Sequence, residues 1–197
     1  MDGKRKLLIL KLDLIDSMRE IDAIRQAVAQ KAAGLVEVRA VGCEKPEDII
    51  TAVADDQPDW VHIVGRSNDE ALIFSGGKSG ESQFDRIRLL KHLRRAVPGL
   101  ALLTLNSKLD NRDLGNMGQL RTVIGMQDGY NPLASRQFMP RFYANICLGM
   151  PLAPAAKTAI EGMQPEVVQH GGMPSMCFSR SIDPETFLFL PRETAVN

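Results

Sequence analysis

The sequence predicts an α/β fold, in which helices cover both faces of a mainly parallel sheet. Short continuous runs of leucine and β-branched residues, typical of buried strands, alternate with segments whose apolar residues recur every three or four positions. The 197 residues are 44% hydrophobic and 24% charged, as in an ordinary globular protein. Because no repeat, low-complexity tract or linker interrupts this pattern, we expect residues 1–197 to form a single domain.

The predicted strands are the apolar runs that turn residues or helical segments separate. In chain order they are residues 6–12, 35–42, 60–65, 100–106 and 121–127, with one more candidate in the tail at 186–190. A shorter apolar run at 71–74 precedes a Gly/Ser-rich turn at 75–82.

The predicted helices begin at capping residues or prolines, and each carries one apolar face. They are a helix that Asp16 or Ser17 caps and Gly34 ends, one at 46–54, one at about 83–97, one from 131 to near 149, and one that starts at Pro154. The apolar face of the first helix is expected to contain Met18, Ile21, Ile24 and Val28. Pro140 is expected to bend or interrupt the fourth helix, because proline removes a helical hydrogen bond and crowds the preceding turn.

One segment has no clear pattern. Residues 163–181 (MQPEVVQHGGMPSMCFSRS) contain two prolines, a Gly-Gly pair and a mixture of apolar and polar side chains. We interpret this segment as a mobile loop or an interface.

Charge and cysteine usage narrow the functional classes. The 24 Lys and Arg balance the 24 Asp and Glu, which argues against a dedicated nucleic-acid coat. No apolar run approaches the roughly 20 residues of a membrane span, and the run at 7–10 is too short for a signal peptide. Cys43, Cys147 and Cys177 are odd in number and far apart, so neither a disulfide framework nor a zinc site is expected. We expect a cytoplasmic protein with reduced thiols.

Neither a cofactor nor a metal is expected. Gly77-Lys78-Ser79 matches only the end of a P-loop, because residue 72 is leucine where the motif needs its first glycine. No Gly-rich dinucleotide motif follows the first strand. His62 lies in a predicted buried strand, where a hydrogen-bonded structural role is the ordinary one, and no histidine has a carboxylate or thiol at metal-ligand spacing.

The helix predicted at 83–97 carries a dense set of cations. They are Arg86, Arg88, Lys91, Arg94 and Arg95, with His92 among them. Because the other side of this helix is apolar, we expect the cations to form a solvated outer face. We interpret that face as a candidate docking surface for an acidic protein partner. Nucleic acid is the alternative, although no aromatic side chains interleave with the charges to stack on bases.

A set of ordered motifs also runs through the predicted strands and the fourth helix. They are residues 59–65 (DWVHIVG), 103–106 (LTLN) and 123–127 (VIGMQ), followed by Phe138, Phe142-Tyr143 and Leu148-Gly149. Taken together, the set resembles the CHAT family of caspase-like cysteine proteases (clan CD, haemoglobinase fold), over residues 6–160. The resemblance implies a three-layer sandwich with helices on both faces of the sheet.

The two catalytic positions of that family are substituted here. The resemblance places the catalytic histidine directly after Gly65 and the nucleophilic cysteine two residues after Asn106, where this sequence has Arg66 and Lys108. Arginine stays protonated and cannot act as the base, and lysine is a poor acyl-transfer nucleophile unless it is strongly desolvated. We therefore expect no catalytic residues.

The remains of the active site are expected to form a cleft. Its lining residues would be Gly65, Ser67, Asn106 and Ser107. Arg66 and Lys108 would make this cleft cationic, so that it either holds an acidic peptide or an anion or is a vestige.

The resemblance and the missing dyad together lead to a functional expectation. It is a catalytically inactive caspase-like domain that binds a protein as a regulatory or scaffolding module, for instance beside an active protease, and that self-associates or docks through its sheet edge. One alternative is a caspase-like peptidase whose nucleophile has moved to another position. A second alternative is a nucleic-acid-binding accessory protein that uses the basic helix at 86–95.

Overall fold

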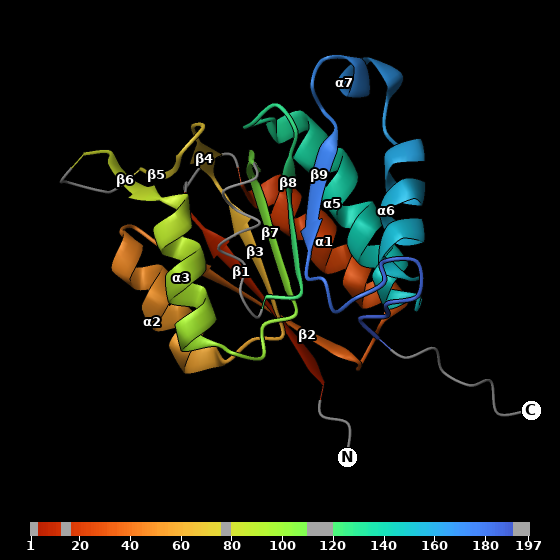
Figure 1. Ribbon diagram of the computed structural model, residues 1–197, viewed down its shortest axis with the longest axis horizontal. Coiled ribbons are helices and arrows are strands. Elements are labelled where there is room, and N and C mark those ends of the chain that lie inside the picture. Colours follow the sequence, from red (N-terminus) through yellow and green to blue (C-terminus); the bar gives the residue numbers. More distant parts are fainter. Residues whose placement is uncertain (1–3, 13–16, 76–79, 110–119, 191–197) are drawn as a thin grey trace, which may run out of the picture.

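A six-stranded sheet divides the molecule into three layers (Figure 1). The computed structural model describes residues 4–12, 17–75, 80–109 and 120–190. In spatial order the strands are β2 (Val36–Gly42), β1 (Arg5–Lys11), β3 (Trp60–Val64), β7 (Leu102–Lys108), β8 (Thr122–Met126) and β9 (Pro174–Phe178). The first five run parallel and β9 is antiparallel to β8, which confirms the predicted α/β class and its mainly parallel sheet.

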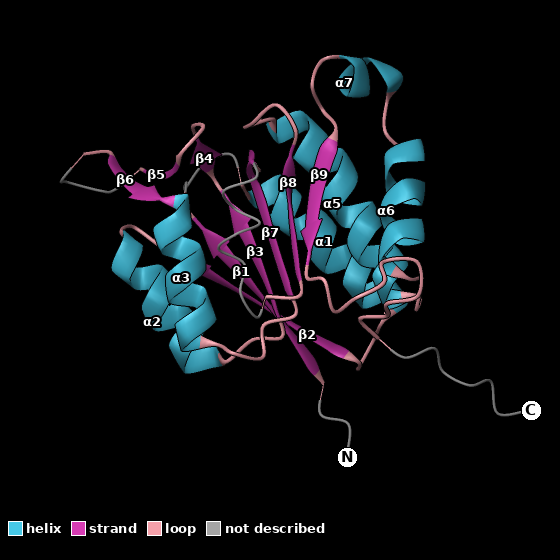
Figure 2. Ribbon diagram, viewed as in Figure 1, coloured by secondary structure: helices cyan, strands magenta, loops and turns pink. Residues whose placement is uncertain are grey.

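Helices cover both faces of this sheet (Figure 2). On one face lie α2 (Pro46–Asp56) and α3 (Arg86–Ala96), and on the other lie α1 (Met18–Lys31), α5 (Pro132–Cys147) and α6 (Leu152–Glu161). The short helix α7 (Pro165–Gln169) follows α6. Because successive side chains of a strand point to opposite faces of the sheet, the strands contribute to two apolar clusters. In β1, Leu7 and Ile9 face α1 and α5, whereas Leu8 and Leu10 face α2 and α3.

A second, smaller sheet lies between β3 and α3 in the chain. It consists of β4 (Arg66–Ser67), β5 (Ala71–Phe74) and β6 (Ser82–Asp85), all antiparallel. The prediction that this helix begins at about residue 83 is therefore wrong, because residues 82–85 form a strand that pairs with β5. The helix begins at Arg86, where Asp85 caps it by accepting a hydrogen bond from the Arg88 N–H. Gly77-Lys78-Ser79 lies outside the described residues.

The C-terminal tail corrects one predicted strand. Residues 186–190 do not form a strand. Phe189 and Leu190 are instead buried in the core, where Phe189 packs edge-on against Trp60. The last strand, β9, lies earlier, within the 163–181 segment that has no clear sequence pattern, and α7 lies in the same segment. Because β9 is an edge strand that pairs only with β8, it lacks the continuous apolar run that marks the central strands.

Two helices differ from expectation in detail. Ser17 precedes α1 but makes no capping bond with its side chain, and Asp16 lies outside the described residues. Ile21, Ile24 and Val28 are buried as predicted, whereas Met18 is 43% exposed because it lies at the open first turn. α5 continues through Pro140 without interruption, since the buried side chains on either side hold both halves against the sheet. No described helix is long and apolar enough to cross a membrane.

Candidate functional site

The carboxyl ends of β3 and β7 are where the sequence resemblance predicts a cleft. Gly65 directly follows β3, and a Cβ atom there would lie 2.6 Å from Leu12 Cβ. Only glycine fits this approach without displacing Leu12. The chain turns at Gly65 out of the main sheet, so that Arg66 is the first residue of the small sheet.

Arg66 is directed toward the hairpin of the small sheet. Its guanidinium donates to the Glu81 carboxylate and, at 3.3 Å, to Ser75 Oγ, and the side chain is 41% exposed. The Glu81 carboxylate offsets the charge that the sequence assigned to a cationic pocket. Lys108, the last residue of β7, is half-buried.

A small cavity does lie at this end of the sheet, but neither substituted position lines it. Its walls are Ser17, Glu20, Val64, Gly65, Asn106, Tyr130, Pro132 and Arg136. The cavity measures about 10 Å³, close to the smallest space that holds one water molecule. It is too small for a peptide side chain or an organic anion.

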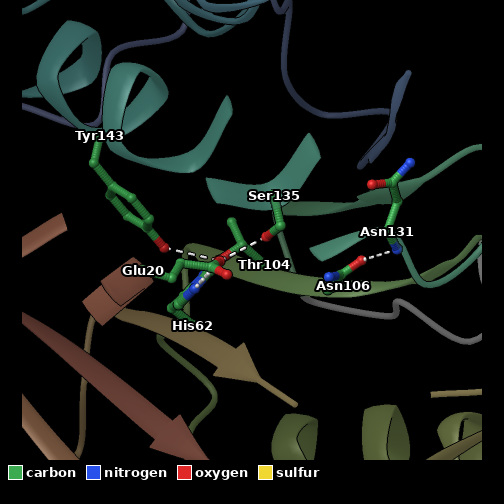
Figure 3. A network of polar contacts seen from close by, with 7 residues as sticks. All are labelled: Glu20, His62, Thr104, Asn106, Asn131, Ser135 and Tyr143. Atoms are coloured by element: carbon green, nitrogen blue, oxygen red, sulfur yellow. Dashed lines mark hydrogen bonds and ion pairs between the residues drawn. The ribbon is translucent and has the colours of Figure 1, made fainter. Parts of the chain in front are cut away.

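The other expected lining residues are brought together and hold the scaffold. Ser67 Oγ donates to the backbone oxygen of Asn106 at 2.8 Å, which ties β4 to β7. Asn106 Oδ1 accepts from the Asn131 N–H at 2.8 Å, as Figure 3 shows. Asn131 in turn caps α5 by accepting from the Ala134 N–H at 3.0 Å. The asparagine at the end of β7 therefore fixes the start of α5.

Arg86 is the cation that the sequence analysis misplaced. Its side chain is buried, with 2% of the residue exposed, and does not belong to the outer face of α3. The guanidinium donates to the backbone oxygen of Asp69 at 2.9 Å and to Ser107 Oγ at 3.1 Å. Arg86 enters the protein because it is the first residue of α3, where the helix meets β7 and the small sheet. The remaining predicted cations, Arg88, Lys91, Arg94 and Arg95, are exposed as expected.

A buried polar network occupies the layer between the sheet and the helices α1 and α5 (Figure 3). His62 on β3 lies beside Thr104 on β7, and their Nδ1 and Oγ1 atoms are 2.5 Å apart. His62 Nε2 lies 3.1 Å from Glu20 Oε1 on α1. Tyr143 OH lies 2.8 Å from Thr104 Oγ1, and Ser135 Oγ donates to Glu20 Oε1 at 2.6 Å. None of the five residues is more than 3% exposed.

One direction of donation satisfies every polar hydrogen in this network. Burial raises the pKa of Tyr143, with smaller upward effects of Glu20 and Cys147 and a downward effect of the bond to Thr104. The phenol therefore keeps its proton and donates to Thr104. Thr104 then donates to His62 Nδ1, and His62 donates from Nε2 to Glu20. In the reverse direction the phenolic hydrogen would have no acceptor within the network.

The network has the connectivity of an acyl-transfer triad, in the order hydroxyl, imidazole and carboxylate. Such chemistry needs a carbonyl carbon within reach of the hydroxyl oxygen, and Thr104 is fully buried. The arrangement therefore orients side chains inside the fold and has no access to substrate. The structural role predicted for His62 is confirmed.

The hydrogen-bonding partners of His62 were not predicted, although the sequence around Glu20 contains an indication of its role. Glu20 lies four residues before Ile24 on the buried stripe of α1, where a carboxylate needs a hydrogen-bonding partner. Thr104 directly faces His62 across the parallel pair of strands. Nothing in the local sequence indicates that Ser135, 115 residues from Glu20, completes the network.

The three thiols are enclosed by the fold, including Cys43, which directly follows β2. Cys43, Cys147 and Cys177 are buried and form no disulfide. Burial raises the pKa of Cys43 to about 12, with a further contribution from Asp48, and burial raises the pKa of Cys147 to about 12. Both thiols are therefore protonated at neutral pH. The described residues contain no group of three or more His, Cys, Asp or Glu side chains that could hold a metal ion.

The larger opening near these strand ends lies over the small sheet. It is a groove of about 620 Å³ whose walls include Asp69, Glu70 and Asp85, with Arg88 from α3. The groove is shallow and has no buried polar group directed into it.

No protein-family model matches the chain, and no curated protein matches it.

Proposed function

We propose that this chain is a catalytically inactive, caspase-like domain of the CHAT type that acts as a protein-binding module of a regulatory or scaffolding kind. One observation carries the proposal. The two positions that would hold the dyad carry Arg66 and Lys108, and Arg66 is engaged with Glu81. A guanidinium remains protonated across the physiological range, so residue 66 itself supplies no proton acceptor. The mainly parallel sheet between two helical layers supports the fold that this proposal needs.

The chemistry of the cysteines argues against a peptidase with a relocated nucleophile. A nucleophilic cysteine is a thiolate that reaches solvent beside a base. Here Cys43 and Cys147 are buried and protonated, and Cys177 is 6% exposed on β9. His62, the histidine nearest to the strand ends, has both ring nitrogens engaged inside the protein.

The outer face of α3 is the surface that best fits a partner. We define this basic face as Arg88, Lys91, Arg94 and Arg95. All four side chains are exposed, and the ion pairs found among the described residues leave them out. A positive face attracts an acidic protein surface and speeds the encounter with it.

Nucleic acid is the second candidate for the same face, because four adjacent cations also suit a phosphate backbone. α3 itself (RIRLLKHLRRA) contains no Phe, Tyr or Trp on which the bases of a single strand could stack. His92 is the ring nearest to the basic face, and it packs against Phe84. The affinity would therefore be electrostatic only and would fall steeply with salt.

The test is affinity capture from native lysate with the intact chain and with the variant Arg94→Glu/Arg95→Glu. The control variant, Lys31→Glu/Lys157→Glu, makes the same change in net charge on the exposed sides of α1 and α6. We expect one stoichiometric protein partner with the wild type and the control, and its loss with the α3 variant. Recovery of the chain alone contradicts the binding function. Absorbance at 260 nm and a salt-sensitive band shift would favour nucleic acid instead.

A further inference from the structure

The edge strand β2 presents an outward row of backbone groups that no described strand pairs, and of these the Val36 N–H donates to the Ala32 oxygen at 3.4 Å. β2 hydrogen-bonds to β1 on one side and, within the described residues, to no strand on the other. The Arg5 N–H donates to Leu35, and the Cys43 N–H donates to Lys11. Odd-numbered residues of β2 therefore direct their backbone groups toward β1, and Val36, Val38, Ala40 and Gly42 direct theirs outward. The strand contains no proline, the residue that commonly protects such an edge.

The sequence of this edge is complementary to itself. When two copies of residues 35–41 (LVEVRAV) are set antiparallel about Val38, Glu37 lies opposite Arg39 of the other copy, twice by symmetry. Val38 faces its own copy, Val36 faces Ala40, and Leu35 faces Val41. The two Glu37–Arg39 pairs lie on the α2 face of the sheet. The Val38–Val38 pair and the two Val36–Ala40 pairs lie on the α1 face, where these apolar residues contact the core.

The charges also select this register over its neighbours. Outward groups can pair only with outward groups, so the registers next to the Val38-centred one are centred on residue 37 or 39. Centring on residue 37 sets Glu37 against Glu37, and centring on residue 39 sets Arg39 against Arg39. Like charges directly opposite each other destabilise a pair of strands, whereas opposite charges stabilise it. Among these three registers, only the one centred on Val38 brings unlike charges together.

Both charged side chains are accessible. Glu37 is exposed, and within the described part of the chain it forms no ion pair. Arg39 is 57% exposed and donates from Nη1 to Asp56 at 2.9 Å. A guanidinium has five donors, so this bond leaves others for a second carboxylate.

Apolar surface continues beside the edge on the α1 side. Two hollows, of about 260 and 180 Å³, lie between α1 and β2. Val28, Ala29, Ala32, Val36 and Val38 line the first, and Met18, Ile21 and Ala40 line the second. Met18, which lines the second hollow, is one of the larger exposed apolar side chains.

We propose that two copies of this chain associate through β2, antiparallel and about a two-fold axis at Val38, so that their sheets join into one continuous sheet. The occupant is a second copy because the edge matches itself in charge and in apolar pattern, as an isologous interface requires. This inference concerns a different surface from the basic face of α3 and does not depend on the proposed function.

Sedimentation velocity of the full chain over a range of concentrations tests the proposal. We expect a dimer for the wild type. Glu37→Arg sets arginine against arginine, and Arg39→Glu sets glutamate against glutamate, so each variant alone should weaken the dimer by at least about tenfold. Mixing the two variants places every arginine opposite a glutamate. The mixture should therefore sediment as a heterodimer, and the double variant Glu37→Arg/Arg39→Glu should form a homodimer.

Two further variants make the result specific to this edge. Val38→Pro removes an outward N–H and keeps the pairing with β1, so it should abolish the dimer while circular dichroism shows an unchanged fold. Glu161→Arg, an equal charge change on exposed α6, should leave the dimer intact. A wild-type monomer at about 100 μM overturns the proposal. A dimer that Glu37→Arg and Val38→Pro leave unchanged also overturns it, because that dimer would use another surface.

Discussion

Thr104 is the residue on which the buried network depends, because it contacts both His62 and Tyr143. Thr104→Val should remove both hydrogen bonds and leave two buried polar groups without partners, at a cost of about 2–4 kcal/mol in the free energy of unfolding. Tyr143→Phe removes only the first donor of the network and should cost about 1 kcal/mol. Urea denaturation of both variants measures the difference. Equal losses would contradict the direction of donation derived for the network.

Two glycines, Gly65 and Gly125, lead to a second prediction about single residues. Gly65→Ala places a Cβ atom 2.6 Å from Leu12 Cβ, and Gly125→Ala places one 2.5 Å from the Ser107 oxygen. Each substitution should lower the free energy of unfolding by at least about 2 kcal/mol, because backbone or core atoms must move. Gly99→Ala is the matched control, since nothing lies within 4 Å of its added Cβ. Thermal unfolding of the three variants should separate Gly99→Ala from the other two.

Single residues show where sequence reasoning reaches its limit. His62 was predicted correctly as a structural residue, because a histidine inside a run of apolar strand residues must bury its ring. Ser67, Asn106 and Ser107 were predicted to line a cleft at the strand ends, and of these Asn106 lines the small cavity found there, whereas Ser67 and Ser107 hold neighbouring segments together. Their hydrogen bonds use partners far along the chain, as in the bond from Asn131 to Asn106, and no local pattern specifies such partners.

At the scale of the element, α3 shows how one residue can be misassigned. Arg86 and Arg94 look alike in the sequence, yet the first is buried and the second exposed. Arg86→Met should lower the free energy of unfolding by about 2–3 kcal/mol, because the hydrogen bonds to Asp69 and Ser107 are lost inside the protein. Arg94→Met, the control on the same helix, should change it by less than about 0.5 kcal/mol. If both variants unfold at the same urea concentration, the bonds of Arg86 do not anchor α3.

Whole strands were predictable where burial on both faces produced a continuous apolar run. The segments that became β1, β3, β7 and β8 all have that pattern, and their positions were predicted to within about two residues. β6 was missed because its sequence, SQFD, is polar and it pairs only with β5. The apolar run at 186–190 was mistaken for a strand because packing into the core and pairing in a sheet require the same residue types.

At the scale of the whole molecule, three layers exclude solvent from the thiols, and this sets a pH limit on stability. The pKa of Cys43 and that of Cys147 are raised from 9.0 to about 12 in the folded chain. A raised pKa contributes stability that is complete below pH 9 and is lost between pH 9 and about 12, because the unfolded chain releases these protons first. Tyr143, whose pKa burial also raises, acts in the same direction. The melting temperature should fall progressively over this range, and it should fall less in Cys43→Ala/Cys147→Ala.

The same burial determines how fast the thiols of the native protein react with an electrophile. This reactivity distinguishes a binding module from a cysteine peptidase, which needs a reactive thiol. Iodoacetamide reacts with exposed thiolates, and all three thiols of this chain are buried. At pH 8 we expect no labelling within the minutes that a free thiol needs, and three labels per chain once urea unfolds it. Intact-mass spectrometry counts the labels in both states. One thiol that reacts rapidly in the native chain but slowly after unfolding would mean that the fold activates it. That result would restore the relocated nucleophile as the better account of the function.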